Sequence, residues 1–292
     1  MRKNYDMGHA NIKLAGLFCV IAAFSASIMV LFVKLAAPGT TNSMTIFFRF
    51  LVSFLYSVII ICHGRVIRRK PFPLAVHRLW LHAVRAVFGL GSMLCLYYAL
   101  RFIPLMDGTL LSMTNPLFIP LIALLLFGIK TKHKVVAAIV VGFLGVLLVI
   151  RPGYGMVNPH AIYALGSGVS AAFSIVLLRE LAKHDKPQTI MFYYFLFALI
   201  LSSIIAAFDW QMPNAHTLLL LLGVGIFGTF YQEFLIRASA LAPAPIISVC
   251  LYTFVVFSGI LDYLVWGLKP DLLSCMGLLI ICVSSYFVTK SK

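Results

Sequence analysis

Long apolar runs dominate this sequence and limit the chain to a small set of folds. Ten runs each contain about 16 or more residues, close to the roughly 20 that a helix needs to cross a bilayer. Apolar residues make up 62% of the chain, more than a soluble core of this size can bury, and only 11% of the residues are charged. The sequence therefore predicts an all-α integral membrane protein with ten transmembrane helices, at about residues 14–33, 43–62, 80–100, 105–127, 135–150, 160–178, 189–208, 217–236, 243–265 and 272–289.

The distribution of Lys and Arg predicts the orientation of the chain. If the N-terminus is cytoplasmic, seventeen of the 23 basic residues fall in inner segments and four in outer segments. Positive residues favour the cytoplasmic side, so we expect a multi-pass protein of the cytoplasmic (inner) membrane with both termini in the cytoplasm. The net charge of +15 is then a topology signal, and no nucleic-acid partner is expected.

Short patterns recur in the same order in the two halves of the chain. Ala-Ala-Phe-Ser at 22–25 recurs at 171–174, Phe-Leu at 50–51 recurs at 195–196, and Gly89, Ala99 and Pro104 have identical residues 139 positions later. These matches predict two homologous five-helix repeats, residues 1–152 and 153–292. Because five is odd, the second repeat enters the membrane inverted relative to the first. Inverted repeats are typical of secondary transporters.

Several motifs identify a family that the chain resembles. They are Phe48-Arg49-Phe50, Tyr98-Ala99-Leu100 with Pro104, Asn115-Pro116, Gly142 and Gly145 before Arg151-Pro152, and in the second half Arg237-Ala238, Leu241, Pro243 and Gly277. Over nearly its whole length the chain resembles the EamA-type members of the drug/metabolite transporter superfamily. The resemblance implies a transporter of small metabolites. Lys130 and Lys269 stand where many members carry glutamate, so the role of that glutamate is not carried over.

Two arginines inside predicted spans are candidate substrate ligands. A charge deep in a bilayer costs about 2.5–3.5 kcal/mol on insertion scales, so Arg49 and Arg85 each need an explanation. Either guanidinium offers a permanent forked cation to a carboxylate or phosphate. The alternatives are that Arg49 snorkels outward or pins a neighbouring helix through its carbonyls, and that Arg85 snorkels to the inner headgroups.

The acidic residues near the spans have simpler alternatives. Glu233 is a candidate for proton coupling, but Arg237 follows four residues later, and an ion pair between them is a sufficient explanation. Asp262 is expected in the interfacial belt beside Tyr263 and Trp266. Asp107 falls in the first turn of its span, where an acid complements the helix dipole.

Prolines within the fourth span predict a kink near the membrane midplane. Pro116 and Pro120 remove backbone hydrogen bonds, and transporter sites tend to form where helices are interrupted. Asn115 adjoins that point, and Tyr97, Tyr98 and Tyr252 are candidates to line the same cavity. Kinked packing without a ligand is the alternative.

The motifs of membrane-embedded enzymes and of ATP-driven pumps do not occur in the sequence, and the six cysteines show no metal-binding spacing. We therefore expect no enzyme activity, cofactor or metal. The predicted function is secondary transport, by alternating access, of a small polar metabolite such as an amino acid, a nucleoside-like compound or S-adenosylmethionine. A flippase for lipids or lipid-linked sugars is the alternative, followed by a membrane-embedded enzyme. A homodimer is possible.

Overall fold

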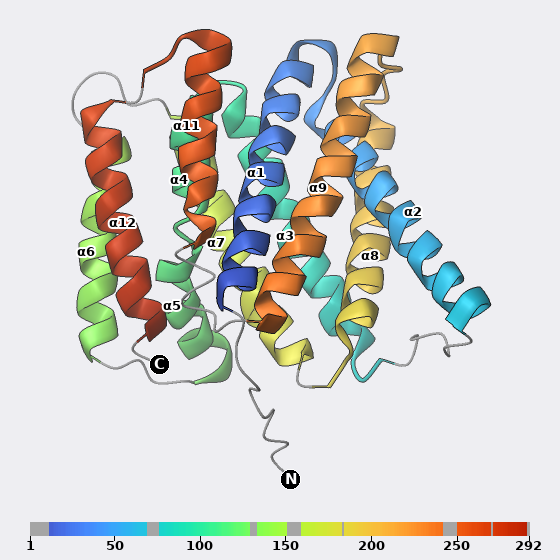
Figure 1. Ribbon diagram of the computed structural model, residues 1–292, viewed down its shortest axis with the longest axis horizontal. Helices are drawn as coiled ribbons and strands as arrows, with labels where there is room; N and C mark the ends of the chain where they lie inside the picture. The colour runs from blue at the N-terminus through green and yellow to red at the C-terminus, as the bar shows by residue number, and fades with distance from the viewer. Residues whose placement is uncertain are drawn as a thin grey trace.

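A computed structural model describes residues 12–68, 76–128, 133–150, 159–182, 184–241, 250–269 and 271–290, and these form a helical bundle without strands (Figure 1). Its elements are α1 (Ile12–Ala36), η1 (Ala37–Gly39), α2 (Asn42–Arg68), α3 (Leu79–Leu100), α4 (Leu105–Ser112), α5 (Asn115–Phe127), α6 (His133–Ile150), α7 (Ala161–Leu181), α8 (Pro187–Phe208), α9 (Ala215–Leu241), α11 (Thr253–Trp266) and α12 (Leu272–Lys290).

The helices have the length and composition of membrane spans. Seven helical stretches of the described chain are long and apolar enough to cross a bilayer, with α4 and α5 counted as one. Three shorter apolar helices, Val136–Leu148, Thr253–Trp266 and Leu272–Ser284, occupy the remaining predicted spans. Many large apolar side chains face outward, such as Leu125, Leu219 and Leu279. The fold is that of a multi-pass membrane protein.

Helices from the first part of the chain pack side by side with helices from the second part. In Figure 1, α6 and α12 pack together at one side of the bundle and α2 lies at the other, against α8 and α9. Between them, α1 packs against α9 and α11, and α3 packs against α7 and α8. Helix α1 begins and α12 ends at the same end of the bundle, which we call the termini end; the opposite end is called the far end.

The predicted fourth span is two helices. The α-helical hydrogen-bond pattern is interrupted at Met113 and Thr114, so α4 and α5 are separate elements that together cover 105–127. Pro116 lies in the first turn of α5, where its missing N–H costs nothing, and Pro120 lies inside α5. In place of the predicted kink, the helix is interrupted about two turns before Pro120. Two lysines stand where many members of the resembled family carry glutamate. Lys130 lies outside the described residues, and Lys269 is exposed beyond the end of α11.

Candidate functional site

A cavity that is partly open lies where the N-terminal and C-terminal halves of the bundle meet. Its volume is about 180 Å³, smaller than the roughly 300–1,000 Å³ of pockets for drug-sized ligands. Helices α1, α3, α4, α5, α7, α8, α9 and α11 all contribute to its wall. The polar and charged residues that line it are Arg85, Ser92, Ser112, Asn115, Ser167, Ser174, Tyr194, Tyr231 and Gln232. None of the acidic residues that the structure describes lines this cavity.

Arg85 supplies the positive charge of the cavity wall. Its side chain is 5% exposed, and its guanidinium carbon lies 4.4 Å from the centre of the Tyr194 ring. Its one described hydrogen bond, from Nη1 to the Ile190 carbonyl, is long at 3.5 Å, and Nε has no partner among the described residues. Gly89, one turn along α3, permits this arrangement, because a Cβ there would lie 2.6 Å from Tyr194 Cε2. The snorkelling alternative is not what the structure shows: Arg85 is buried beside the cavity.

Arg49 lies just behind the same cavity. It is 2% exposed, its Nε lies 3.4 Å from Met29 Sδ, and its Nη1 has no described partner. Met29 lines the cavity, whereas Arg49 itself does not. The Tyr97 hydroxyl also donates to Met29 Sδ, at 3.5 Å, so Tyr97 belongs to the Arg49 surroundings and does not line the cavity.

The break between α4 and α5 brings Asn115 to the cavity and Tyr252 to the break. Asn115 Nδ2 donates to the Ser112 carbonyl at 3.3 Å, and the Tyr252 hydroxyl donates to the Met113 carbonyl at 3.2 Å. Carbonyls freed by an interrupted helix need such partners inside a membrane. The two side chains therefore satisfy the interrupted backbone, and of the two only Asn115 lines the cavity.

Gly168 of α7 packs directly against this break, and we expect its replacement to be costly. A Cβ at Gly168 would lie 2.6 Å from Thr114 Oγ1 and 3.0 Å from the Leu111 carbonyl oxygen. Overpacking of this kind costs about 1–3 kcal/mol, so Gly168→Ala should lower stability by about that much in a detergent unfolding titration.

Gly166, on the same helix, is the matched control. No described atom beyond its own helix and chain neighbours lies within 4 Å of a Cβ placed there. Because alanine is the better helix former, Gly166→Ala should leave stability unchanged or raise it by up to about 1 kcal/mol. Equal effects of the two substitutions would contradict close packing at the break.

Two other predicted site residues lie away from the cavity. Tyr98 packs among Phe102, His160 and Tyr163, with ring centres 4.7–5.7 Å from its own. Glu233 accepts hydrogen bonds from Arg237 at 2.9 Å and 2.8 Å, as the i,i+4 spacing predicts. The neighbouring Gln232, not Glu233, lines the cavity.

Sequence reasoning missed the serines of the cavity. Ser167 and Ser174 lie on one face of α7 together with Ala171 and Leu178, at the i, i+4, i+7 and i+11 spacing that a helix needs for a shared face. The Ser167 hydroxyl lies 3.1 Å from that of Ser92 on α3. This spacing of small polar residues was the signal that could have found them.

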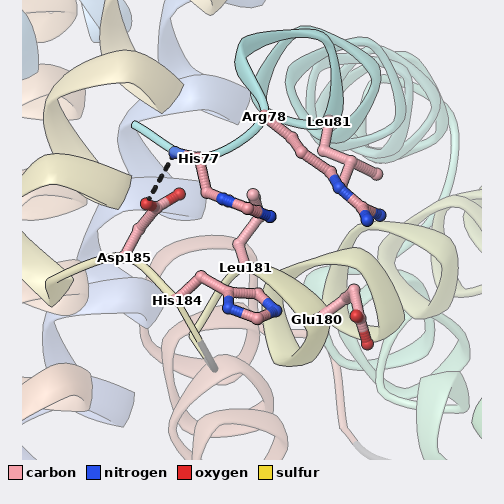
Figure 2. A pocket seen from close by; sticks show the side chains of 7 residues that line it. All are labelled: His77, Arg78, Leu81, Glu180, Leu181, His184 and Asp185. Carbon is pink, nitrogen blue, oxygen red and sulfur yellow. Dashed lines mark hydrogen bonds between the residues drawn. The ribbon is translucent and has the colours of Figure 1, made fainter. Parts of the chain in front are cut away.

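At the termini end, a buried acid joins the two halves. Asp185, between α7 and α8, lies 2.8 Å from His82 Nε2 of α3. It also accepts a hydrogen bond from the His77 backbone N–H at 3.1 Å (Figure 2). The His77 and His184 rings stack with centres 4.7 Å apart. The hollow lined by His77, His184 and Asp185, among others, holds about 10 Å³, room for about one water, so it is a contact between halves and not a ligand pocket.

At the far end, a different set of polar contacts joins the halves. Asp262 of α11 accepts a hydrogen bond from the Met106 N–H of α4 at 2.9 Å and lies 3.9 Å from Lys34 Nζ of α1. Ser274 donates to Asp107 at 2.9 Å. The prediction that Asp262 sits in an interfacial belt is wrong: it is 2% exposed, because it caps a helix of the other half.

Comparison with known proteins follows the same division of the chain. The EamA-like transporter family matches twice, at residues 13–151 and 158–290. The pseudopaline exporter CntI of Pseudomonas aeruginosa is 28% identical over 284 residues, which cover 96% of this chain and 98% of the exporter. The riboflavin transporter of Vibrio cholerae is 27% identical over 72% of this chain and 71% of its own length. The S-adenosylmethionine uptake transporter of Rickettsia prowazekii is 24% identical over 75% of this chain and 74% of its own length.

A solved crystal structure shares the fold. It superposes with a TM-score of 0.63 over 95% of this chain and 96% of the other, at 18% sequence identity. The family match covers nearly all of the described helices, and the family predicted from the sequence motifs is confirmed. This chain belongs to the EamA-like transporter family of the drug/metabolite transporters.

Proposed function

We propose that this protein carries a small anionic metabolite of about amino-acid size across the cytoplasmic membrane by alternating access. One observation carries the proposal: the cavity between the two halves exposes the Arg85 guanidinium and several hydroxyl and amide groups, but no described acid. A buried cation without a counter-charge is unfavourable, so a carboxylate or phosphate of the solute completes the site. The same absence of an acid argues against an organic cation as the solute.

The arrangement of the halves supports alternating access. With α1, α2, α3 and α5 taken as the equivalents of α7, α8, α9 and α11, the contact of α1 with α9 has its counterpart in α3 with α7. The contact of α2 with α9 likewise has a counterpart in α3 with α8, and that of α1 with α11 in α7 with α5. The family match to each half points the same way. Two inverted repeats, about 1–152 and 153–292, account for this pattern.

Matching details support the same relation between the repeats. The helix breaks at Met113 and Tyr252 are 139 residues apart, as are Gly128 and Gly267, which end α5 and α11 with φ angles of 65° and 68°. Left-handed glycines at the ends of two helices in matching positions are readily explained by a repeated sequence.

The polar contacts at the two ends fit the role of alternating closures. Asp185 holds the halves together at the termini end, and Asp262 does so at the far end. With both termini cytoplasmic, the contacts around Asp185 close the cavity toward the cytoplasm, and those around Asp262 close it toward the outside. Transport then requires each set to open in turn.

Counterflow in proteoliposomes tests the proposal. Vesicles are loaded with unlabelled metabolites, and uptake is followed for labelled anionic amino acids such as glutamate and aspartate, with nucleosides and S-adenosylmethionine as neutral and cationic comparisons. We expect one labelled anionic solute to accumulate transiently, and empty liposomes to accumulate none. If folded protein moves no solute in the panel but scrambles fluorescent lipids, the chain is a flippase and the proposal is wrong.

A further inference from the structure

Arg49 is a second buried cation beside the cavity, and the described contacts leave it poorly satisfied. Its Nε points at the sulfur of Met29, a weak acceptor, the neutral Tyr97 hydroxyl lies beside the guanidinium, and Nη1 has no described hydrogen-bond partner. It also lies 5.0 Å from the centre of the neighbouring Phe50 ring. Neither a thioether nor an aromatic ring supplies the counter-charge that a buried guanidinium needs.

Met29 separates Arg49 from the cavity. The Met29 side chain lines the cavity on one side and contacts the Arg49 guanidinium on the other. Gly228 of α9 packs closely against this contact, because a Cβ there would lie 3.0 Å from both Arg49 Nε and Met29 Sδ. Methionine is unbranched and adapts its shape easily, so a rotation of this side chain opens Arg49 to the cavity.

The seven acidic residues that the structure describes all lie in other surroundings than those of Arg49 and Arg85. The chain has eight, and Asp6 lies outside the described residues. Of the other seven, Glu180 lines the hollow at the termini end, and the remaining six have the following contacts: Asp107 with Ser274, Asp185 with His82, Asp209 with Ser43, Glu233 with Arg237, Asp262 with Lys34 and Met106, and Asp271 with the Leu273 N–H. No described carboxylate is therefore available to Arg49 or to Arg85.

We infer that the transported solute carries two anionic groups, one bound by Arg85 and the other by Arg49 once Met29 has moved aside. The inference rests on the proposed function and narrows its substrate class to dianionic metabolites, such as dicarboxylates of amino-acid size. Arg85 on α3 and Arg49 on α2 flank the packed rings of Tyr194 and Phe50, whose centres are 5.7 Å apart. A single anionic group neutralises one guanidinium and leaves the other buried without a counter-charge.

Matched pairs of compounds that differ by one charge test this inference. The pairs are L-glutamate with L-glutamine, L-aspartate with L-asparagine, and succinate with succinamate. Each is used as a competitor of the labelled solute that counterflow identifies, and as a ligand in thermal unfolding of the purified protein. We expect at least one dianionic member to act at a concentration about tenfold or more below that of its amide partner, because a charge-assisted bidentate hydrogen bond is lost in the amide.

Variants of Arg49 test whether the preference for the dianion over its amide partner depends on this residue. In Arg49→Gln the acid and amide members should act at the same concentration, whereas Arg49→Lys, which keeps the charge, should retain part of the preference. Arg179→Gln, which removes an exposed arginine from α7, should keep the full preference. Monodisperse elution and a cooperative melt establish that each variant is folded.

The outcomes separate this inference from the proposed function. Amides that act as well as acids, or a preference that survives Arg49→Gln, overturn the two-anion site even if transport is observed. Failure of every dianion to compete or to stabilise the protein also overturns it. If no solute moves but a dianion stabilises the protein through Arg49, the two-anion site stands and the transport proposal fails.

Discussion

Arg85→Gln is expected to raise the half-saturating concentration of the transported solute about a hundredfold. Removing one partner of a buried, hydrogen-bonded charge pair costs about 2–5 kcal/mol, and about 2.8 kcal/mol corresponds to a hundredfold change. The amide of glutamine retains hydrogen-bonding capacity but not the charge, so binding is weakened and not abolished. Counterflow over a range of solute concentrations measures the change.

The same substitution should leave the empty protein as stable as before, or more stable. In the absence of solute, Arg85 Nε has no described partner and its Nη1 makes one long hydrogen bond to Ile190. Removing a buried charge that lacks a counter-charge should lower the cost of folding, because the charge no longer has to be taken out of water. Thermal unfolding without solute measures this effect.

A purely structural role for Arg85 predicts a different combination of results. If Arg85 holds α3 to α8 through Tyr194 and Ile190, the glutamine variant loses stability and transport together. Arg179→Gln is the control, since it removes a charge from the exposed side of α7 and should change neither measurement. Weaker binding without lost stability therefore distinguishes a substrate ligand from a structural clamp.

The sequence predicted the helices better than the faces that they bury. Long apolar runs and proline positions locate the spans, and nearly all of the described helices fall where they were expected. A transmembrane helix is apolar on its lipid-facing side and on its packed side, so hydrophobicity does not tell which side faces the cavity. That is why Tyr98, which packs among aromatic rings at the far end of α3, was placed in the site and Tyr194 was not.

Charge was the more informative signal for the candidate site. Arg49 and Arg85 were identified because a buried charge is costly in a membrane, and the structure places one in the cavity wall and the other directly behind Met29. Asp262 was misassigned because its partner, the first turn of α4, is about 156 residues away in sequence. Only the packing of the two halves brings that helix end to the acid.

Asp262→Ala is expected to cause the largest loss of stability among the substitutions considered. It leaves the Met106 N–H without its acceptor and the Lys34 ammonium without its carboxylate. Breaking a buried ion pair in this way costs about 3–5 kcal/mol. Asp262→Asn should cost less, because the amide oxygen can still accept from the Met106 N–H. Unfolding of the purified protein in detergent, titrated with denaturant, ranks the variants.

Two further variants identify the cause of that loss. Asp271→Ala removes an acid that accepts a hydrogen bond from the exposed Leu273 N–H, so it should cost only about 0.5–2 kcal/mol. The double variant Lys34→Met with Asp262→Ala should recover part of the stability, because it leaves no uncompensated charge, although the Ile103 carbonyl loses the hydrogen bond that Lys34 Nζ donates at 2.8 Å. A double variant no more stable than Asp262→Ala alone would show that the helix cap, and not the ion pair, provides the stabilisation. Because Lys34 and Asp262 belong to different halves of the chain, the contact also joins α1 to α11 at the far end.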